Sequence, residues 1–223
     1  MITTISCIDP IIEPIRQVEA LLSSQAQAAN SPFEATLAGL IAAGGKRLRP
    51  RIALLSGNAL GAGPVPLINL ATAIEMLHTA TLIHDDVVDG SRLRRGVETL
   101  NARWSAAASV LTGDLAFTRA ARLIHNTRSF PVVEMFTRTM AVMVESEVNQ
   151  LARTQGFTRR ADYFSWIGSK TAALFELAAG APALLSQAGE TAFSAARRFG
   201  HGIGMAFQIV DDVLDLTGEP ARL

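Results

Sequence analysis

The chain has 223 residues, 49% of them hydrophobic, which is enough to bury one sizeable core. Its 20 basic and 20 acidic residues cancel, so no overall field favours nucleic acid or an anionic membrane surface as a partner. The single cysteine, Cys7, excludes an internal disulfide and a thiolate metal cluster. No long run of uncharged apolar residues occurs, so we expect one domain over residues 1–223, a cytoplasmic location and no transmembrane segment.

Apolar residues recur at three- and four-residue spacing along most of the chain, and β-branched alternation is rare. This pattern predicts an all-α fold, and the glycine and proline clusters between periodic stretches indicate roughly eight or more helices. Predicted helices cover 32–43, 68–88, 111–125 and 195–216. The last three are apolar on more than one face, which is typical of central helices in a bundle around a cavity.

A basic loop precedes the helix that begins near Pro50. Gly44 and Gly45 lead into Lys46, Arg47 and Arg49. Backbone amides at a helix start and arginine guanidinium groups both favour phosphate. These three cationic residues are therefore candidate substrate-binding residues, although a solvated basic loop would give the same pattern.

Six of the nine aspartates fall in two short clusters with the same spacing. Asp85 and Asp89 are four residues apart on one predicted helix, as are Asp211 and Asp215 on another, so each pair shares a helix face. Like charges at that spacing repel, and carboxylates that follow apolar turns are partly desolvated. Oxygen ligands of this kind favour Mg²⁺. The alternative interpretation is a pair of solvated acidic helix ends.

These motifs together resemble those of trans (head-to-tail) isoprenyl diphosphate synthases of the polyprenyl synthase family. The likeness extends from about residue 33 to 218 and comprises Gly44–Pro50, Asp85–Asp89 with Arg94-Arg95-Gly96, Gly113-Asp114, Glu147 with Gln150, Lys170-Thr171-Ala172, and Phe207–Asp215. The resemblance implies an isoprenoid-synthase fold. It also implies that an allylic prenyl diphosphate ionises, isopentenyl diphosphate attacks the cation, and proton loss gives a longer prenyl diphosphate.

The resemblance further implies roles for individual residues. The implied Mg²⁺ ligands are Asp85, Asp89, Asp211 and Asp215. Asp86, Asp212 and Lys170 complete the expected catalytic set. The residues expected to hold isopentenyl diphosphate are Lys46, Arg49, His78 and Arg95. Those expected at the allylic diphosphate or its cation are Arg94, Lys170, Thr171, Phe207 and Gln208.

Product length is expected to depend on the helical turn before Asp85. In the family a bulky aromatic residue near there closes the product tunnel, whereas this chain has Ala80 and Thr81. The resemblance therefore favours a long-chain synthase. It also implies a homodimer, and it implies that the chain lacks the further C-terminal helices usual in the family.

Two other functions remain open. A class I terpene cyclase also ionises a prenyl diphosphate with Mg²⁺, but it binds no second diphosphate and would not need Lys46 and Arg49. A non-catalytic regulatory subunit of a heteromeric prenyl synthase would fit a chain that ends early, although all six clustered aspartates are present.

Overall fold

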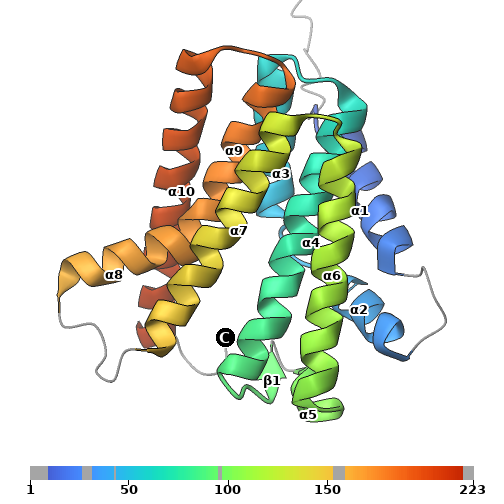
Figure 1. Ribbon diagram of the computed structural model, residues 1–223, viewed down its shortest axis with the longest axis vertical. Helices are drawn as coiled ribbons and strands as arrows, with labels where there is room; N and C mark the ends of the chain where they lie inside the picture. The colour runs from blue at the N-terminus through green and yellow to red at the C-terminus, as the bar shows by residue number, and fades with distance from the viewer. Residues whose placement is uncertain (1–9, 27–31, 43, 95–96, 153–158, 218–223) are drawn as a thin grey trace, which may run out of the picture.

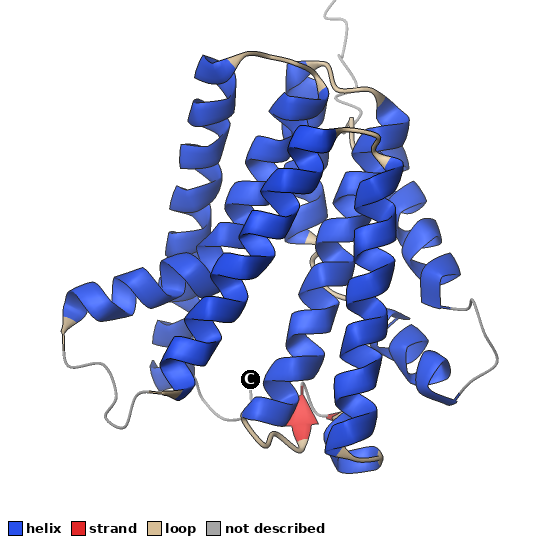
Figure 2. Cartoon of the chain, viewed as in Figure 1, coloured by secondary structure: helices blue, strands red, loops and turns tan. Residues whose placement is uncertain are grey.

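The computed structural model describes residues 10–26, 32–42, 44–94, 97–152 and 159–217, and these form a helical bundle (Figure 1). The helices are α1 (Ile12–Ala26), α2 (Pro32–Ala42), α3 (Leu48–Leu60), α4 (Pro64–Val88), α5 (Leu100–Arg103), α6 (Ala106–Asn126), α7 (Phe130–Leu151), α8 (Arg160–Ile167), the π-helical turn η1 (Gly168–Ala172), α9 (Ala173–Leu185) and α10 (Glu190–Thr217). Figure 2 shows one small exception to helix, an antiparallel pairing of β1 (Leu93–Arg94) with β2 (Val97–Glu98). The all-α prediction is confirmed, and the hairpin was not expected.

The helices begin and end at residues whose chemistry explains the boundary. Pro64 opens α4, where a proline lacks only an N–H that would have no helical partner. Ser105 precedes α6, and its side chain accepts a hydrogen bond from the Ala108 amide. Gly61, in the left-handed conformation, ends α3. The predicted helices at 32–43, 68–88 and 111–125 therefore correspond to α2, α4 and α6.

Helix α4 is the central element of the bundle. It packs along α6 and also contacts α3, α9 and α1. Buried residues run almost continuously from Leu70 to Leu77. By length and hydropathy α4 is the one helix among the described residues that could cross a membrane, yet 61% of its apolar window is buried inside the protein, as in a core helix.

Helix α10 lies at the edge of the bundle rather than in its centre, so the prediction of a central helix at 195–216 is wrong. Its fully buried residues are Gly200 and Gly204, while Phe199 and Val210 are exposed. A β-carbon on Gly204 would lie 2.5 Å from Ala172 Cα. The two glycines thus let α10 approach η1 and α9 closely, and its apolar outer face remains open.

Helices α4, α7 and α10 run in the same direction in Figure 1, so their C-terminal ends gather at one end of the bundle. Both aspartate clusters lie at that end, since Asp85 is in the last turn of α4 and Asp211 is near the end of α10. The fold therefore gathers the two clusters at one end of the bundle.

Candidate functional site

The first aspartate cluster is held by the short hairpin that follows α4. Asp86 accepts a hydrogen bond from Arg94 Nε at 2.8 Å. The backbone of the same aspartate accepts one from the Ser91 amide at 3.0 Å. The hairpin thus folds Arg94 back over the helix end. Asp89 caps α4 and is exposed.

Burial makes it energetically unfavourable for Asp85 and Asp86 to be ionised. Desolvation raises the pKa of Asp85 above its ordinary value, and the neighbouring Lys170 offsets part of that increase. Burial also raises the pKa of Asp86, against the opposing effect of Arg94. A further cation near these carboxylates would therefore be stabilising.

Lys170 lies between the first cluster and α7. Its Nζ is 3.1 Å from Glu147 Oε2 and 3.7 Å from Asp85 Oδ1. The ammonium also lies 5.3 Å from the centre of the Trp166 ring. Within the described part of the chain, the other carboxylate oxygen of Glu147, Oε1, is buried without a hydrogen-bond partner. This buried oxygen is a ready acceptor for a cation or a bound water.

The second cluster is connected to the residue after Lys170. Thr171 donates a 2.6 Å hydrogen bond to Gln208 Oε1, and Gln208 Nε2 donates one of 2.7 Å to Asp212 Oδ1. Tyr163 donates a 2.5 Å hydrogen bond to the other oxygen of Asp212 and its pKa rises to about 12, mainly because of this bond. The dipeptide Lys170-Thr171 therefore contacts Asp85 of the first cluster and is linked through Gln208 to Asp212 of the second.

Arg49 links the basic loop to the second cluster. Its guanidinium lies 4.5 Å from the centre of the Phe175 ring and 5.9 Å from that of Phe207. Burial lowers its pKa to about 10, although the charges of Glu75 and Asp211 act in the opposite direction. A buried guanidinium flanked by aromatic rings is well placed to bind an anion that enters from the cluster side.

Arg47 faces the protein interior. Its Nη1 donates to Glu75 Oε1 at 2.9 Å and its Nη2 to the Ile41 carbonyl at 2.7 Å. The backbone of Arg47 is left-handed, with φ of 48°. Lys46, by contrast, is exposed. Substrate binding by Arg47 stays a prediction, and its observed contacts anchor the loop that carries Lys46 and the start of α3, where Arg49 lies.

The remaining predicted residues occupy α4 or lie outside the described residues. His78 is partly exposed, two helical turns before Asp85. Ala80 is fully buried, and the Thr81 hydroxyl donates to the His78 carbonyl at 2.8 Å. Arg95 lies outside the described residues. The chain-length role of Ala80 and Thr81 stays a prediction.

The donor set suits a hard divalent cation. Among the residues that the structure describes, no three His, Cys, Asp or Glu side chains gather closely enough to hold a metal ion by themselves. Mg²⁺, however, commonly binds through one or two carboxylates and completes its coordination with water and substrate phosphates. Asp85 and Asp89 at one helix end, with the buried oxygen of Glu147 nearby, fit such a shared ion.

Sequence reasoning missed two residues of this site. Tyr163, the one tyrosine of the chain, and Glu75, a buried carboxylate in the middle of an apolar helix, received no role. A charge inside an otherwise apolar helix is a signal that a partner is required, so Glu75 was detectable. Nothing in the sequence connects Tyr163 with Asp212, because they are 49 residues apart.

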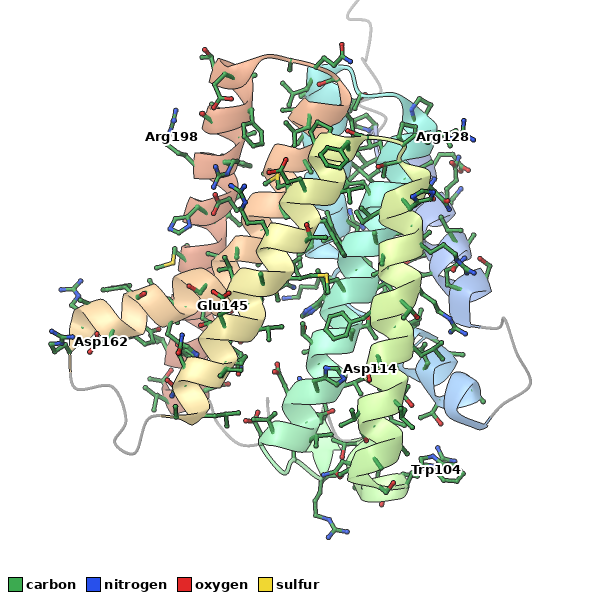
Figure 3. The ribbon with its side chains drawn as sticks, viewed as in Figure 1. Trp104, Asp114, Arg128, Glu145, Asp162 and Arg198 are labelled. Carbon is green, nitrogen blue, oxygen red and sulfur yellow. The ribbon has the colours of Figure 1, made fainter. Side chains whose placement is uncertain are left out.

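A second contact steadies α4 near the first cluster. His84 Nε2 lies 3.1 Å from the Val110 carbonyl and 3.6 Å from Asp114 Oδ1. Figure 3 shows Asp114 on α6, which packs along α4. A β-carbon at Gly113 would collide with the His84 ring. The Gly113-Asp114 pair is therefore required for close contact between α6 and the end of α4.

Comparison with known families agrees with the geometry. The family model described as polyprenyl synthetase matches residues 30–223. The octaprenyl diphosphate synthase of Haemophilus influenzae is 42% identical over 185 residues, which cover 82% of this chain and 56% of that protein. The chain thus spans a little over half the length of this curated relative.

Solved structures give the same result. A decaprenyl diphosphate synthase from Rhodobacter capsulatus superposes with a TM-score of 0.87 at 40% identity, covering 92% of this chain and 64% of that one. A polyprenyl synthase from Caulobacter crescentus, complexed with calcium and isoprenyl diphosphate, also has a TM-score of 0.87 at 40% identity and covers 92% and 63%.

Proposed function

Because the chain belongs to the polyprenyl synthetase family, we propose that it is a head-to-tail prenyltransferase. It joins isopentenyl diphosphate to an allylic prenyl diphosphate, forms a longer polyprenyl diphosphate and releases diphosphate. The observation that carries this proposal is that Lys170 contacts Asp85 of the first cluster, while the next residue, Thr171, is linked through Gln208 to Asp212 of the second. One dipeptide thereby brings together the groups that two substrate diphosphates and their counter-ions require.

The two substrates occupy different parts of the site in this proposal. Lys46, Arg49 and His78 bind isopentenyl diphosphate, with Arg95 as a further predicted ligand. Lys170, Arg94 and Gln208 orient the allylic diphosphate. A diphosphate beside Lys170 would compete for the ammonium that now contacts Glu147 and Asp85. Substrate binding would therefore rearrange this ion pair.

Mg²⁺ is the cofactor we propose, held by Asp85 and Asp89 on one side and by Asp211 and Asp215 on the other. When bound, it would supply Lewis acidity and stabilise the charge of the leaving diphosphate. The protein's own contribution is to orient the carboxylates and to exclude water. In this proposal the Phe207 ring and the Thr171 hydroxyl stabilise the allylic cation, as an aromatic ring and an oxygen both can.

The proposed product is a long prenyl chain, in a cytoplasmic enzyme. Ala80 is small and fully buried, so α4 itself places no bulky side chain at this position. The relatives from Haemophilus influenzae and Rhodobacter capsulatus are named octaprenyl and decaprenyl diphosphate synthases. Replacement of Ala80 by phenylalanine should shorten the products, as measured by mass spectrometry.

A second copy of this chain is the proposed protein partner. Leu111 on α6 is 69% exposed and Val144 on α7 is 53% exposed. Apolar side chains left open on adjacent long helices favour association. Light scattering after size-exclusion chromatography tests this directly, since a mass near twice 23.7 kDa is expected.

The experiment that tests the proposed function is incubation with isopentenyl diphosphate, an allylic primer and Mg²⁺, followed by product sizing. Of the alternatives, a terpene cyclase would release cyclic hydrocarbon from the primer alone. A regulatory subunit would show no turnover. The proposed function requires elongated diphosphates that depend on both substrates.

A further inference from the structure

Both carboxylate oxygens of Asp212 accept hydrogen bonds from protein side chains. Tyr163, on α8, donates to Oδ2 at 2.5 Å, and Gln208, one helical turn earlier on α10, donates to Oδ1 at 2.7 Å. Hydrogen bonds to an ionised acceptor are strong and fix its orientation. The middle aspartate of the second cluster is thus already held by the protein.

The hydrogen bonds continue toward the first cluster. Gln208 uses its other amide atom, Oε1, to accept from Thr171 at 2.6 Å. Lys170, the residue before Thr171, lies 3.7 Å from Asp85 Oδ1. A polar chain therefore joins α8, α10 and η1, and it ends beside the carboxylates of α4.

Packing alone does little to hold the C-terminal half of α10. Its fully buried residues, Gly200 and Gly204, precede the cluster by two to three helical turns. Val210, Val213 and Leu214 are exposed. Side-chain hydrogen bonds must therefore supply much of what fixes this end of the helix in the described chain.

We infer that Tyr163 is a positioning residue of the second cluster: with Gln208 it locks Asp212 in place, and Asp212 keeps both hydrogen bonds when a metal ion and diphosphate bind to the neighbouring carboxylates. This inference rests on the proposed function for its ligands. Asp212 thereby holds the end of α10, so that the positions of Asp211 and Asp215 are fixed. Figure 3 shows Asp162, the residue before Tyr163, near the outer end of α8. A helix outside the aspartate clusters thereby contributes to their geometry.

The single tyrosine gives a direct probe of this contact. Growth on 3-fluorotyrosine labels one position of the chain, so fluorine NMR of the folded protein should show one resonance. In metal-free buffer, we expect Asp212→Asn to shift that resonance. Asp215→Asn, the matched control less than one turn away, should leave it in place. An unshifted resonance in Asp212→Asn would overturn the inference.

Addition of Mg²⁺ and inorganic diphosphate tests the second half of the inference. The wild-type resonance should stay near its metal-free position while the melting temperature rises, because the Tyr163–Asp212 bond persists. Movement of the resonance to the position seen in Asp212→Asn would show that Asp212 leaves Tyr163 for the metal. That result would overturn the inference. Absence of any thermal response would contradict the proposed function, whereas the metal-free comparison would still decide whether Tyr163 holds Asp212.

Calorimetry with Tyr163→Phe provides an independent test that keeps the ring. Loss of a side chain that orients a metal-binding group commonly weakens metal affinity by about 10- to 100-fold. We expect a loss in that range for Mg²⁺ with diphosphate. The control is Phe164→Leu, which alters the ring 5.5 Å away and keeps the hydroxyl. Equal binding by Tyr163→Phe and wild type, both folded, would contradict a positioning role.

Discussion

Lys170 Nζ lies 3.7 Å from Asp85 Oδ1, although the two residues come from η1 and α4, which are far apart in the sequence. The same ammonium lies 3.1 Å from Glu147 on α7. Lys170 thus neutralises two carboxylates in the position where we propose that a diphosphate binds. In the proposed function, this lysine exchanges its carboxylate contacts for a contact with the phosphate.

Asp85→Asn should stabilise the metal-free protein slightly and abolish most of its response to metal. Burial raises the pKa of Asp85, so the native state prefers the protonated form. The stability that protonated Asp85 gives the folded state is present in acid and is lost as the pH rises through the native pKa. At neutral pH the carboxylate is ionised, and its burial therefore lowers the free energy of unfolding. At a ligand concentration a hundred times Kd, binding adds about 2.7 kcal/mol. Thermal melts in EDTA and in Mg²⁺ with diphosphate measure both effects.

The control for this prediction is Glu145→Gln, a change at an exposed carboxylate that Figure 3 labels on α7. It should leave both melts unchanged. A melting temperature for Asp85→Asn that is lower than wild type in EDTA would contradict the assignment of a burial cost to Asp85.

The two lysines of the chain should affect different substrates. Loss of one preorganised donor to a developing anion costs about 10²- to 10³-fold in rate. Lys170→Gln should therefore lower kcat strongly and raise the KM for the allylic substrate. Lys46→Gln should mainly raise the KM for isopentenyl diphosphate. Steady-state kinetics with each substrate varied in turn would refute the assignment if both variants gave the same pattern.

Arg47 and Glu75 should behave as a buried pair. Their side chains are 10% and 9% exposed, and loss of one partner from such a pair typically costs about 3 to 5 kcal/mol. Glu75→Gln and Arg47→Gln should each lower the free energy of unfolding by about that amount, as measured by urea unfolding. The double variant should lose less than the sum of the two single losses. The exposed pair Arg138–Glu134 serves as the control, at about 0.5 kcal/mol or less. Additive effects at Arg47 and Glu75 would contradict the pairing.

Close approach of α10 to η1 should make Gly204 intolerant of a side chain. The β-carbon of Gly204→Ala would lie 2.5 Å from Ala172 Cα, and overpacking of this kind costs about 1 to 3 kcal/mol. Gly202 on the same helix has nothing within 4 Å of the corresponding position. Gly202→Ala should therefore stabilise by up to about 1 kcal/mol. Urea unfolding of the two variants distinguishes them, and equal effects would contradict the packing.

The pKa of Tyr163 gives a pH prediction. With a native pKa of about 12 and an ordinary value near 10, the contribution of the Tyr163–Asp212 bond is fully present below about pH 10. This contribution to the free energy of unfolding is lost between about pH 10 and 12, because the tyrosine ionises at a lower pH in the unfolded chain than in the folded one. Absorbance at 295 nm should follow phenolate formation of this one tyrosine, with a midpoint nearer 10 in Asp212→Asn. The same midpoint in both proteins would argue against the contact.

The sequence predicted most of the helices but not every contact. Periodicity and proline or glycine boundaries predicted α4 and α6 to within five residues, and the four-residue spacing of the carboxylates predicted that Asp85 and Asp89 share a helix face. Periodicity could not show that α10 lies at an edge, because an apolar face looks the same whether or not another helix covers it. The Tyr163–Asp212 bond depends on how α8 crosses α10, which no local pattern encodes.

The most direct test of the account is turnover of this chain with isopentenyl diphosphate, geranyl or farnesyl diphosphate and Mg²⁺, with products sized by mass spectrometry and Asp85→Ala as the control. We predict prenyl diphosphates longer than the primer, formed only with metal and absent in the control. A folded wild-type protein that binds both substrates and Mg²⁺ yet forms no elongated product would contradict the proposed prenyltransferase.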